Sequence, residues 1–192
     1  MKKTLIVLIA IGIAAFANAQ KTKQDEGIKI GIKGGLNVSN LMGDVKDVAI
    51  RTSIHAGIVA EIIVNDKFSI QPELLYSGQG ASATFEGGGR YKLDYITLPV
   101  LAKFPIAKNL YLETGPQVGF LISAKYKDND SNETIPDTKA IDFGLNAGLN
   151  YELNNGVFFQ ARYNLGLTDI GFYGDNERAS NSVIQFSIGK LF

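Results

Sequence analysis

The sequence of 192 residues contains no cysteine, no tryptophan and a single histidine. Without cysteine the chain forms neither a disulfide nor a thiolate metal site, and one histidine cannot build a histidine-rich metal centre. The 19 basic residues balance the 19 acidic ones, which argues against nucleic acid as a partner. The glycine-containing stretches GGLNVSN and EGGGR fit no nucleotide-binding pattern. We therefore expect no cofactor and no metal.

Beyond its first 20 residues, the chain lacks an apolar run near the ~20 residues that a membrane-spanning helix requires. The beginning, MKKTLIVLIAIGIAAFANAQ, has two lysines, a short apolar segment from Leu5 to Phe16, and the small-residue motif Ala17–Asn18–Ala19. This order is typical of a secretory signal peptide, whereas a retained anchor helix would need a longer apolar segment. We predict a cleaved signal peptide over 1–19 and one domain over 20–192.

Apolar residues at every second position dominate the rest of the chain, as in IDFGLNAGLNYEL at 141–153. A period of two predicts extended strands with two unlike faces. Eight segments follow this pattern, and none outside the N-terminal segment has helical periodicity: Ile28–Ser39, Thr52–Val64, Phe68–Gly78, Arg90–Phe104, Leu110–Ala124, Ile141–Leu153, Val157–Ile170 and Asn181–Phe192.

The connections between these segments alternate between short and long. The short ones, 65–67, 105–109 and 154–156, carry the Asn, Asp and Gly of tight hairpins. The long, polar ones are 40–51, 79–89, 125–140 and 171–180. This order predicts an all-β fold, an eight-stranded antiparallel up-and-down barrel that is monomeric and has all its long loops at one end.

Two kinds of closed barrel would give this alternation: a soluble barrel with an apolar interior, and a membrane barrel with an apolar exterior. The polar face is rich in glycine, which weakens a water-exposed strand but fits the cramped interior of a small barrel. The other face is nearly free of charge, and a charge facing lipid costs ~2–4 kcal/mol at the bilayer centre. We therefore predict a transmembrane β-barrel with a filled polar interior.

Charged side chains of both signs share the predicted inward face, where enclosed charges need partners. Lys92 falls on the same phase by alternation, and Lys103 is a further candidate partner for the acids. The predicted interior network comprises Lys29, Lys33, His55, Glu61, Glu73, Glu113, Asp142, Glu152 and Arg162.

Two stretches invite a chemical interpretation. His55 shares its face with Ser53 and Glu61, which raises a lipid hydrolase as an alternative; because His55 falls on the inward phase, we expect an interior polar partner and no enzyme. The stretch DNDSNE at 128–133 begins like a calcium loop, but Lys139 stands where the bidentate glutamate belongs. We expect a solvated loop there.

Two further expectations concern individual strands. Tyr91, Leu93 and Tyr95 share one phase, and Ile96 and the alternate residues after it share the other, which predicts a bulge near 95–96. The chain ends on FSIGKLF, in which Phe186, Ile188 and Phe192 share the lipid-facing phase. This ending resembles the carboxy-terminal signal that the barrel insertion machinery recognises, although Lys190 departs from it.

Four stretches resemble the PorT-like outer-membrane β-barrel family of Bacteroidetes, a porin-like family: IQPELLYSGQGA (70–81), LDYITLPVLAKF (93–104), LYLETGPQVGFLI (110–122) and QARYNLGLTDI (160–170). The resemblance implies an eight-stranded barrel in the outer membrane of a Gram-negative bacterium, in contact with lipid including lipopolysaccharide. It implies no single function. We expect a structural or surface-binding role with an unknown extracellular loop partner; the alternatives are a narrow pore for small solutes and an accessory factor in protein secretion.

Overall fold

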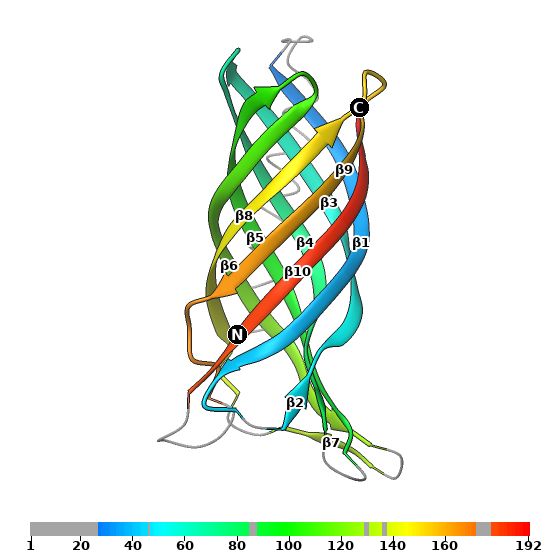
Figure 1. Ribbon diagram of the computed structural model, residues 1–192, viewed down its shortest axis with the longest axis vertical. Helices are drawn as coiled ribbons and strands as arrows, with labels where there is room; N and C mark the ends of the chain where they lie inside the picture. The colour runs from blue at the N-terminus through cyan, green and yellow to red at the C-terminus, as the bar shows by residue number, and fades with distance from the viewer. Residues whose placement is uncertain (1–26, 46, 85–87, 129–130, 136–137, 172–177) are drawn as a thin grey trace, which may run out of the picture.

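The computed structural model describes residues 27–45, 47–84, 88–128, 131–135, 138–171 and 178–192. The predicted signal peptide lies outside these residues. Among them no helix is long and apolar enough to cross a membrane. The strands (Figure 1) are β1 (Ile28–Gly43), β2 (Val48–Ala49), β3 (Arg51–Asn65), β4 (Phe68–Ala83), β5 (Arg90–Ala107), β6 (Leu110–Lys127), β7 (Asn132–Thr134), β8 (Ile141–Glu152), β9 (Val157–Gly166) and β10 (Ala179–Leu191).

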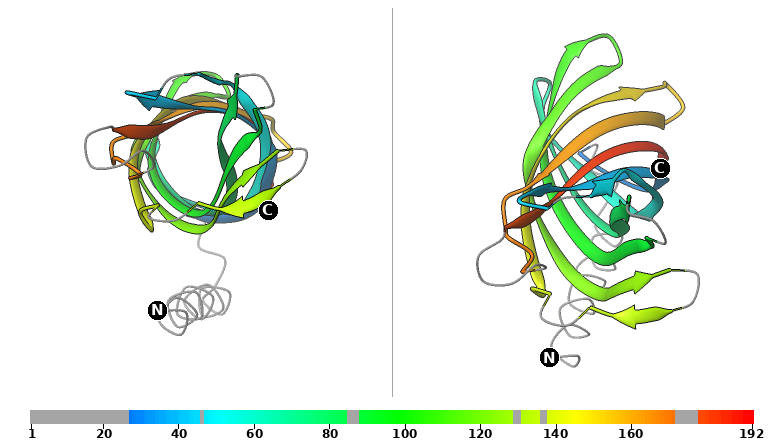
Figure 2. Two further views of the ribbon diagram at one scale, coloured as in Figure 1. Left: turned by 90° about the horizontal axis from the view of Figure 1, so that it is seen from below. Right: turned by 60° about the horizontal axis from the view of Figure 1, so that its bottom comes forward.

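Eight of these strands close into one antiparallel barrel, as predicted. Their order around the wall is β4-β3-β1-β10-β9-β8-β6-β5, and β5 pairs with β4 to complete the circle. The first and last strands are neighbours, with Gly31 opposite Leu191. The short strands β2 and β7 pair with β4 and β6 beyond the closed part of the wall. Figure 2 shows the ring along its axis.

The two ends of the barrel differ. One end, here called the turn end, holds the three tight hairpins that connect β3 to β4, β5 to β6, and β8 to β9. Asn109 (φ 63°) and Gly156 (φ 80°) adopt there the left-handed conformation that such turns require. The opposite end, here called the loop end, holds β2, β7 and the long connections (Figure 1).

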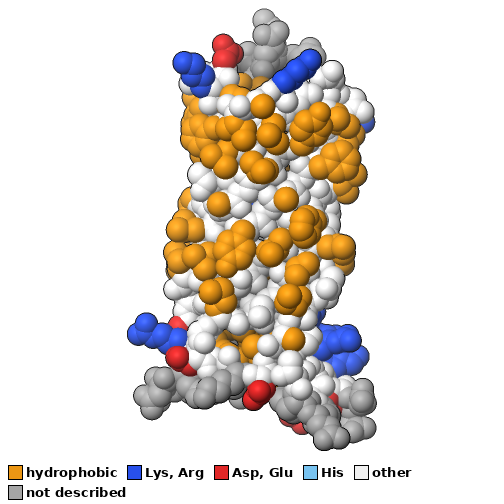
Figure 3. All heavy atoms as spheres, viewed as in Figure 1, with side chains coloured by type: hydrophobic (Ala, Val, Ile, Leu, Met, Phe, Trp, Pro, Cys, Tyr) orange, Lys and Arg blue, Asp and Glu red, His pale blue; other side chains and the backbone are white. Residues whose placement is uncertain are grey.

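The outer face of the wall is apolar, as predicted. Ile32, Phe143 and Phe186 point away from the barrel and are 57%, 53% and 53% exposed. Figure 3 shows hydrophobic side chains spread over the middle of the wall, with basic and acidic side chains gathered at its two ends. Because such a surface is unstable in water and stable in hydrocarbon, the fold is that of a membrane barrel.

A bulge occurs near the predicted position 95–96, but the phase slip predicted for the segment 90–104 is wrong. Leu93, Tyr95 and Thr97 are all buried in β5, so the inward phase runs through the strand without interruption. The register does shift between Asp94 and Tyr95, but the extra residue is Ile122 of β6. Since Leu93 points inward, Lys92 points outward, which corrects its predicted place on the inward face.

Candidate functional site

The centre of the lumen holds a closed network of ion pairs. Arg162 of β9 donates from Nη1 and Nη2 to both carboxylate oxygens of Glu73 of β4, at 2.9 and 2.8 Å. Its Nε donates to Glu113 of β6 at 2.9 Å. The guanidinium is fully buried, and its planar fork matches a carboxylate in the bidentate geometry that gives strong pairs. Three strands are therefore tied together across the lumen.

Lys33 of β1 completes this network. Its Nζ lies 2.9 Å from Glu73 and donates to the side-chain carbonyl of Gln160 at 2.7 Å. Gln160 in turn donates to Glu113 at 2.8 Å. Two cations thus face two carboxylates, so the buried charges balance within the layer. We call Lys33, Glu73, Glu113, Gln160 and Arg162 the central network.

His55 is an interior polar residue in the structure. Its Nδ1 lies 2.8 Å from Asn37 Oδ1 and its Nε2 lies 2.8 Å from Ser187 Oγ. Ser53, the serine considered above, instead donates to the carbonyl of Gly78. Ser187, His55 and Asn37 have the spacing of a nucleophile, a base and an orienting amide, but all three are buried. Ser187 also donates to Gln160, which joins His55 to the central network.

The remaining predicted residues lie outside the central network: Lys29, Glu61 and Glu152 form a second group of ion pairs, and Asp142 lies by itself. Near the turn end, Lys103 of β5 lies 2.8 Å from Glu61 and 3.5 Å from Glu152, and Lys29 lies 3.4 Å from Glu152. Asp142 stands apart from both groups of ion pairs. It accepts a hydrogen bond from Asn181 at 2.8 Å and makes no ion pair within the part of the chain that the structure describes.

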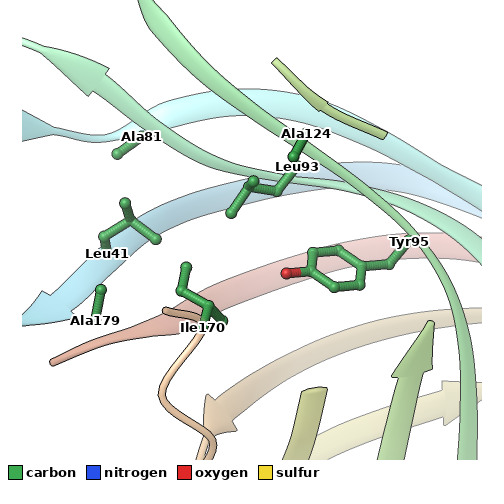
Figure 4. Close-up of a cluster of buried hydrophobic side chains, with 7 residues drawn as sticks. All are labelled: Leu41, Ala81, Leu93, Tyr95, Ala124, Ile170 and Ala179. Atoms are coloured by element: carbon green, nitrogen blue, oxygen red, sulfur yellow. The ribbon is translucent and has the colours of Figure 1, made fainter. Parts of the chain in front are cut away.

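The loop end of the lumen is apolar, which the sequence did not predict. Figure 4 shows the cluster that fills it, here called the apolar plug: Leu41, Ala81, Leu93, Tyr95, Ala124, Ile170 and Ala179. Ile170 was assigned to the strand 157–170, but β9 ends at Gly166 and the following chain carries Ile170 back into the barrel. The lumen is therefore closed by ion pairs at its centre and by apolar packing at its loop end.

The C-terminal residues lie on the outer face. Phe186 and Ile188 of β10 are exposed, as is Phe192 beyond it. Lys190, which departs from the apolar pattern, places its Nζ 5.5 Å from the centre of the Phe192 ring. This contact, at the turn end where the amine reaches the membrane boundary, offsets part of the cost of a cation on this face.

The outer face of the loop end carries four cations that we call the basic rim: Arg90, Lys92, Lys125 and Lys127. A cavity of about 400 Å³ opens beside Arg90, Lys92 and Lys127. Elsewhere at this end, Lys139 donates to Asp169 at 2.7 Å. This bond, together with the backbone N–H groups of Ala179 and Gly171, lowers the pKa of Asp169 to about 2.

The calcium-like stretch 128–133 is only partly described. Asp128 accepts hydrogen bonds from the backbone N–H and the hydroxyl of Ser131, at 2.6 and 3.0 Å. No group of three or more metal-ligating side chains occurs among the described residues.

Comparison with known proteins agrees with this geometry. The family model described as "Outer membrane protein beta-barrel domain" matches residues 18–171. Among solved structures, Neisserial surface protein A (NspA) is similar with a TM-score of 0.58, and the attachment invasion locus protein Ail of Yersinia pestis with 0.53. Each is 14% identical, and each alignment covers 86% of this chain and 99% of the other. Another structure of Ail holds the heparin analogue sucrose octasulfate. Among curated proteins there was no match.

Proposed function

Because the chain belongs to the outer membrane protein β-barrel domain family, we propose that it is a plugged surface module, which anchors its loop end at the outside of the membrane for binding. The observation that carries the proposal is the filled lumen. Arg162 binds Glu73 and Glu113 across the centre, and the apolar plug occupies the loop end. A solute would have to break buried ion pairs to pass, which costs several kcal/mol.

The proposal extends to the cellular setting. The chain is exported with cleavage after residue 19, is inserted by the barrel assembly machinery through its C-terminal strand, and stays monomeric among lipids including lipopolysaccharide. The exposed phase of Phe186, Ile188 and Phe192 supports the insertion step. The turn end faces the periplasm and the loop end faces outward. The PorT-like motifs support the assignment of this chain to a PorT-like subgroup of the family. A role as an accessory factor in protein secretion therefore stays as the alternative function.

We propose no enzymatic role. Ser187, His55 and Asn37 lie inside the wall, with every polar atom of the imidazole already engaged. A hydrolase acting on lipid needs its nucleophile on the outer face or in an open cleft. These three residues are better explained as a hydrogen-bonded bridge between β1, β3 and β10.

Conductance across a planar bilayer tests the plug. We expect no single-channel steps from the purified barrel, under conditions in which an open porin conducts. The matched opened form has Arg162, Glu73 and Lys33 replaced by Ser and, in the apolar plug, Leu93 and Ile170 replaced by Gly. This variant should conduct, and its circular dichroism should match that of the unaltered barrel. Regular steps from the unaltered barrel would overturn the plug and favour the narrow pore.

Epitope accessibility tests the orientation. One variant carries a short peptide tag between residues 131 and 132, at the loop end, and the control carries the same tag between 154 and 155, at the turn end. We expect an antibody to label intact cells only with the first variant and permeabilised cells with both. Labelling of intact cells through the turn-end tag would contradict the proposal.

A further inference from the structure

The basic rim has an unusual pairing pattern. In the β5–β6 ladder, Arg90 stands directly opposite Lys127, and Lys92 stands directly opposite Lys125. Like charges in directly opposed positions of an antiparallel pair destabilise the pair. On the other side of β5, the residues opposite Arg90 and Lys92 are Ser82 and Gly80, which bring no compensating charge.

Carboxylates near the basic rim offset its positive charge only in part. None of its four cations forms an ion pair among the residues that the structure describes, whereas Lys139 at the same end is paired with Asp169. Asp128 accepts two hydrogen bonds from Ser131. Asp94, the next acidic residue on the outer face of β5, interacts with Tyr76 and Arg51 and also attracts Lys92, which in turn is repelled by Lys127, Arg51 and Arg90. Arg51 adds a further positive charge on this side of the rim.

The basic rim continues the lipid-facing surface. The outer positions of β5 are apolar from Ile96 to Ile106. The ten residue steps from the first to the last of them span about 33 Å along the strand at ~3.3 Å per residue. At the usual tilt this is about 23 Å along the barrel axis, close to the ~25 Å band of outer-membrane barrels. Beyond this band the outer face of β5 carries Asp94 and then Lys92 and Arg90, which places the two cations at the depth of lipid headgroups.

A recess beside these cations offers room for a headgroup. Its walls are three of the rim cations, one carboxylate, Asp128, and the small residues Ser82, Ala83, Gly88 and Gly89. Gly89 is held by the hydrogen bond from its backbone N–H to the Tyr126 hydroxyl, at 2.8 Å. A volume of about 400 Å³ lies within the range of small-molecule sites.

We propose that the basic rim binds the phosphorylated sugar headgroup of an outer-leaflet glycolipid whose acyl chains lie against Ile96 and Ile122. The apolar band contacts the chains, and the phosphates bind the four cations, which have no ion pair among the described residues. The phosphates thereby compensate the like-charge pairs of the β5–β6 ladder. The inference rests on the proposed function in one respect, namely that the loop end lies in the outer leaflet.

The experiment uses the full mature barrel in phosphatidylcholine nanodiscs, with diphosphorylated lipid A as the probe at a few mole per cent. The test variant replaces all four rim cations with glutamine (R90Q/K92Q/K125Q/K127Q). The control variant removes three cations at the turn end (K67Q/K108Q/K190Q). We expect lipid A to raise the thermal midpoint of the unaltered barrel and of the control, and to bind the test variant at least tenfold more weakly. The gain should shrink with added salt.

Two further probes separate the lipid from a free anion. Lipid A without phosphates should bind the unaltered barrel at least tenfold more weakly than the diphosphorylated form. Soluble sucrose octasulfate should leave the midpoint unchanged, because it lacks acyl chains. Equal binding of the dephosphorylated lipid, tight binding of the soluble polyanion, or unchanged lipid A binding by the test variant would each overturn the proposal.

Misfolding of the test variant is checked in the same nanodiscs without lipid A. Since the substitutions remove two like-charge pairs, we expect its midpoint to be equal to or higher than that of the unaltered barrel, with the same far-ultraviolet circular dichroism. A lower midpoint would contradict the premise that the pairs repel. Nanodisc binding does not depend on cellular orientation, so a failure here is distinguishable from a failure of the epitope test.

Discussion

Cations in the lumen and cations on the outer face of the loop end have opposite surroundings. Inside the barrel, Arg162 and Lys33 each lie within 3 Å of a carboxylate oxygen. On the outer face, Arg90 and Lys92 stand opposite other cations. The interior is sealed, so the chain itself must supply each counter-charge. The rim lies on the outer face, so its counter-charge can come from the environment.

The largest expected contrast comes from removing one cation on each side. Arg162→Met leaves Glu73 and Glu113 with one cation between them in a sealed layer, which should lower the free energy of unfolding by about 3–5 kcal/mol. Arg90→Met on the outer face should change it by no more than about 0.5 kcal/mol. Urea unfolding in detergent micelles measures both. Equal losses would mean that the central network is not the main support of the lumen.

A pair of leucines compares the apolar plug with the lipid-facing band. Leu93 is fully buried in the plug, whereas Leu98 of the same strand is exposed on the outer face. Leu93→Ala should leave a cavity and cost about 2–5 kcal/mol. Leu98→Ala should cost less, because lipid or detergent chains fill the space that the side chain vacates. Urea unfolding measures the free energy of unfolding of both variants. A larger loss of stability for Leu98→Ala than for Leu93→Ala would contradict the presence of a packed apolar plug.

Two adjacent glycines test how tightly the inner face is packed. A Cβ on Gly35 would lie 2.8 Å from Ser187 Cα and 2.9 Å from His55 Cε1, whereas a Cβ on Gly34 would meet nothing closer than 3.5 Å. Gly35→Ala should therefore destabilise by about 1–3 kcal/mol. Gly34→Ala should be neutral or slightly stabilising, because it restricts the unfolded chain. The comparison fails if the two variants unfold at the same denaturant concentration.

The smallest effect concerns the paired cation at the loop end. Because the hydrogen bond from Lys139 lowers the pKa of Asp169 from 3.8 to about 2, this carboxylate stabilises the fold fully above its ordinary pKa. That contribution is lost as the pH falls through about 2. The stability difference between the unaltered barrel and Asp169→Asn should therefore be small near pH 6 and vanish near pH 2. Carboxyl-carbon NMR of Asp169 gives the midpoint directly, and a midpoint near 4 would exclude the pairing.

The sequence predicted the strands and their faces well for a definite reason. Alternation is local, and placing ionised groups against lipid is costly enough to exclude the opposite phase. Ile32, Phe143 and Phe186 could be assigned outward from their own segments alone. The predicted inward position of Lys92 is wrong because its neighbours Leu93 and Tyr95, although apolar, point into the plug and not toward lipid.

The sequence by itself determined a closed barrel with an apolar exterior and a mainly polar interior, because those properties depend only on period and charge. Only the tertiary structure decided which charges meet. Arg162 and Glu73 are 89 residues apart, and the stagger of eight closed strands sets which side chains face each other across the lumen. The tertiary structure also decided that Ile170 folds back into the loop end of the lumen. The sequence could not predict this, because an apolar side chain is equally stable in the apolar plug and against lipid.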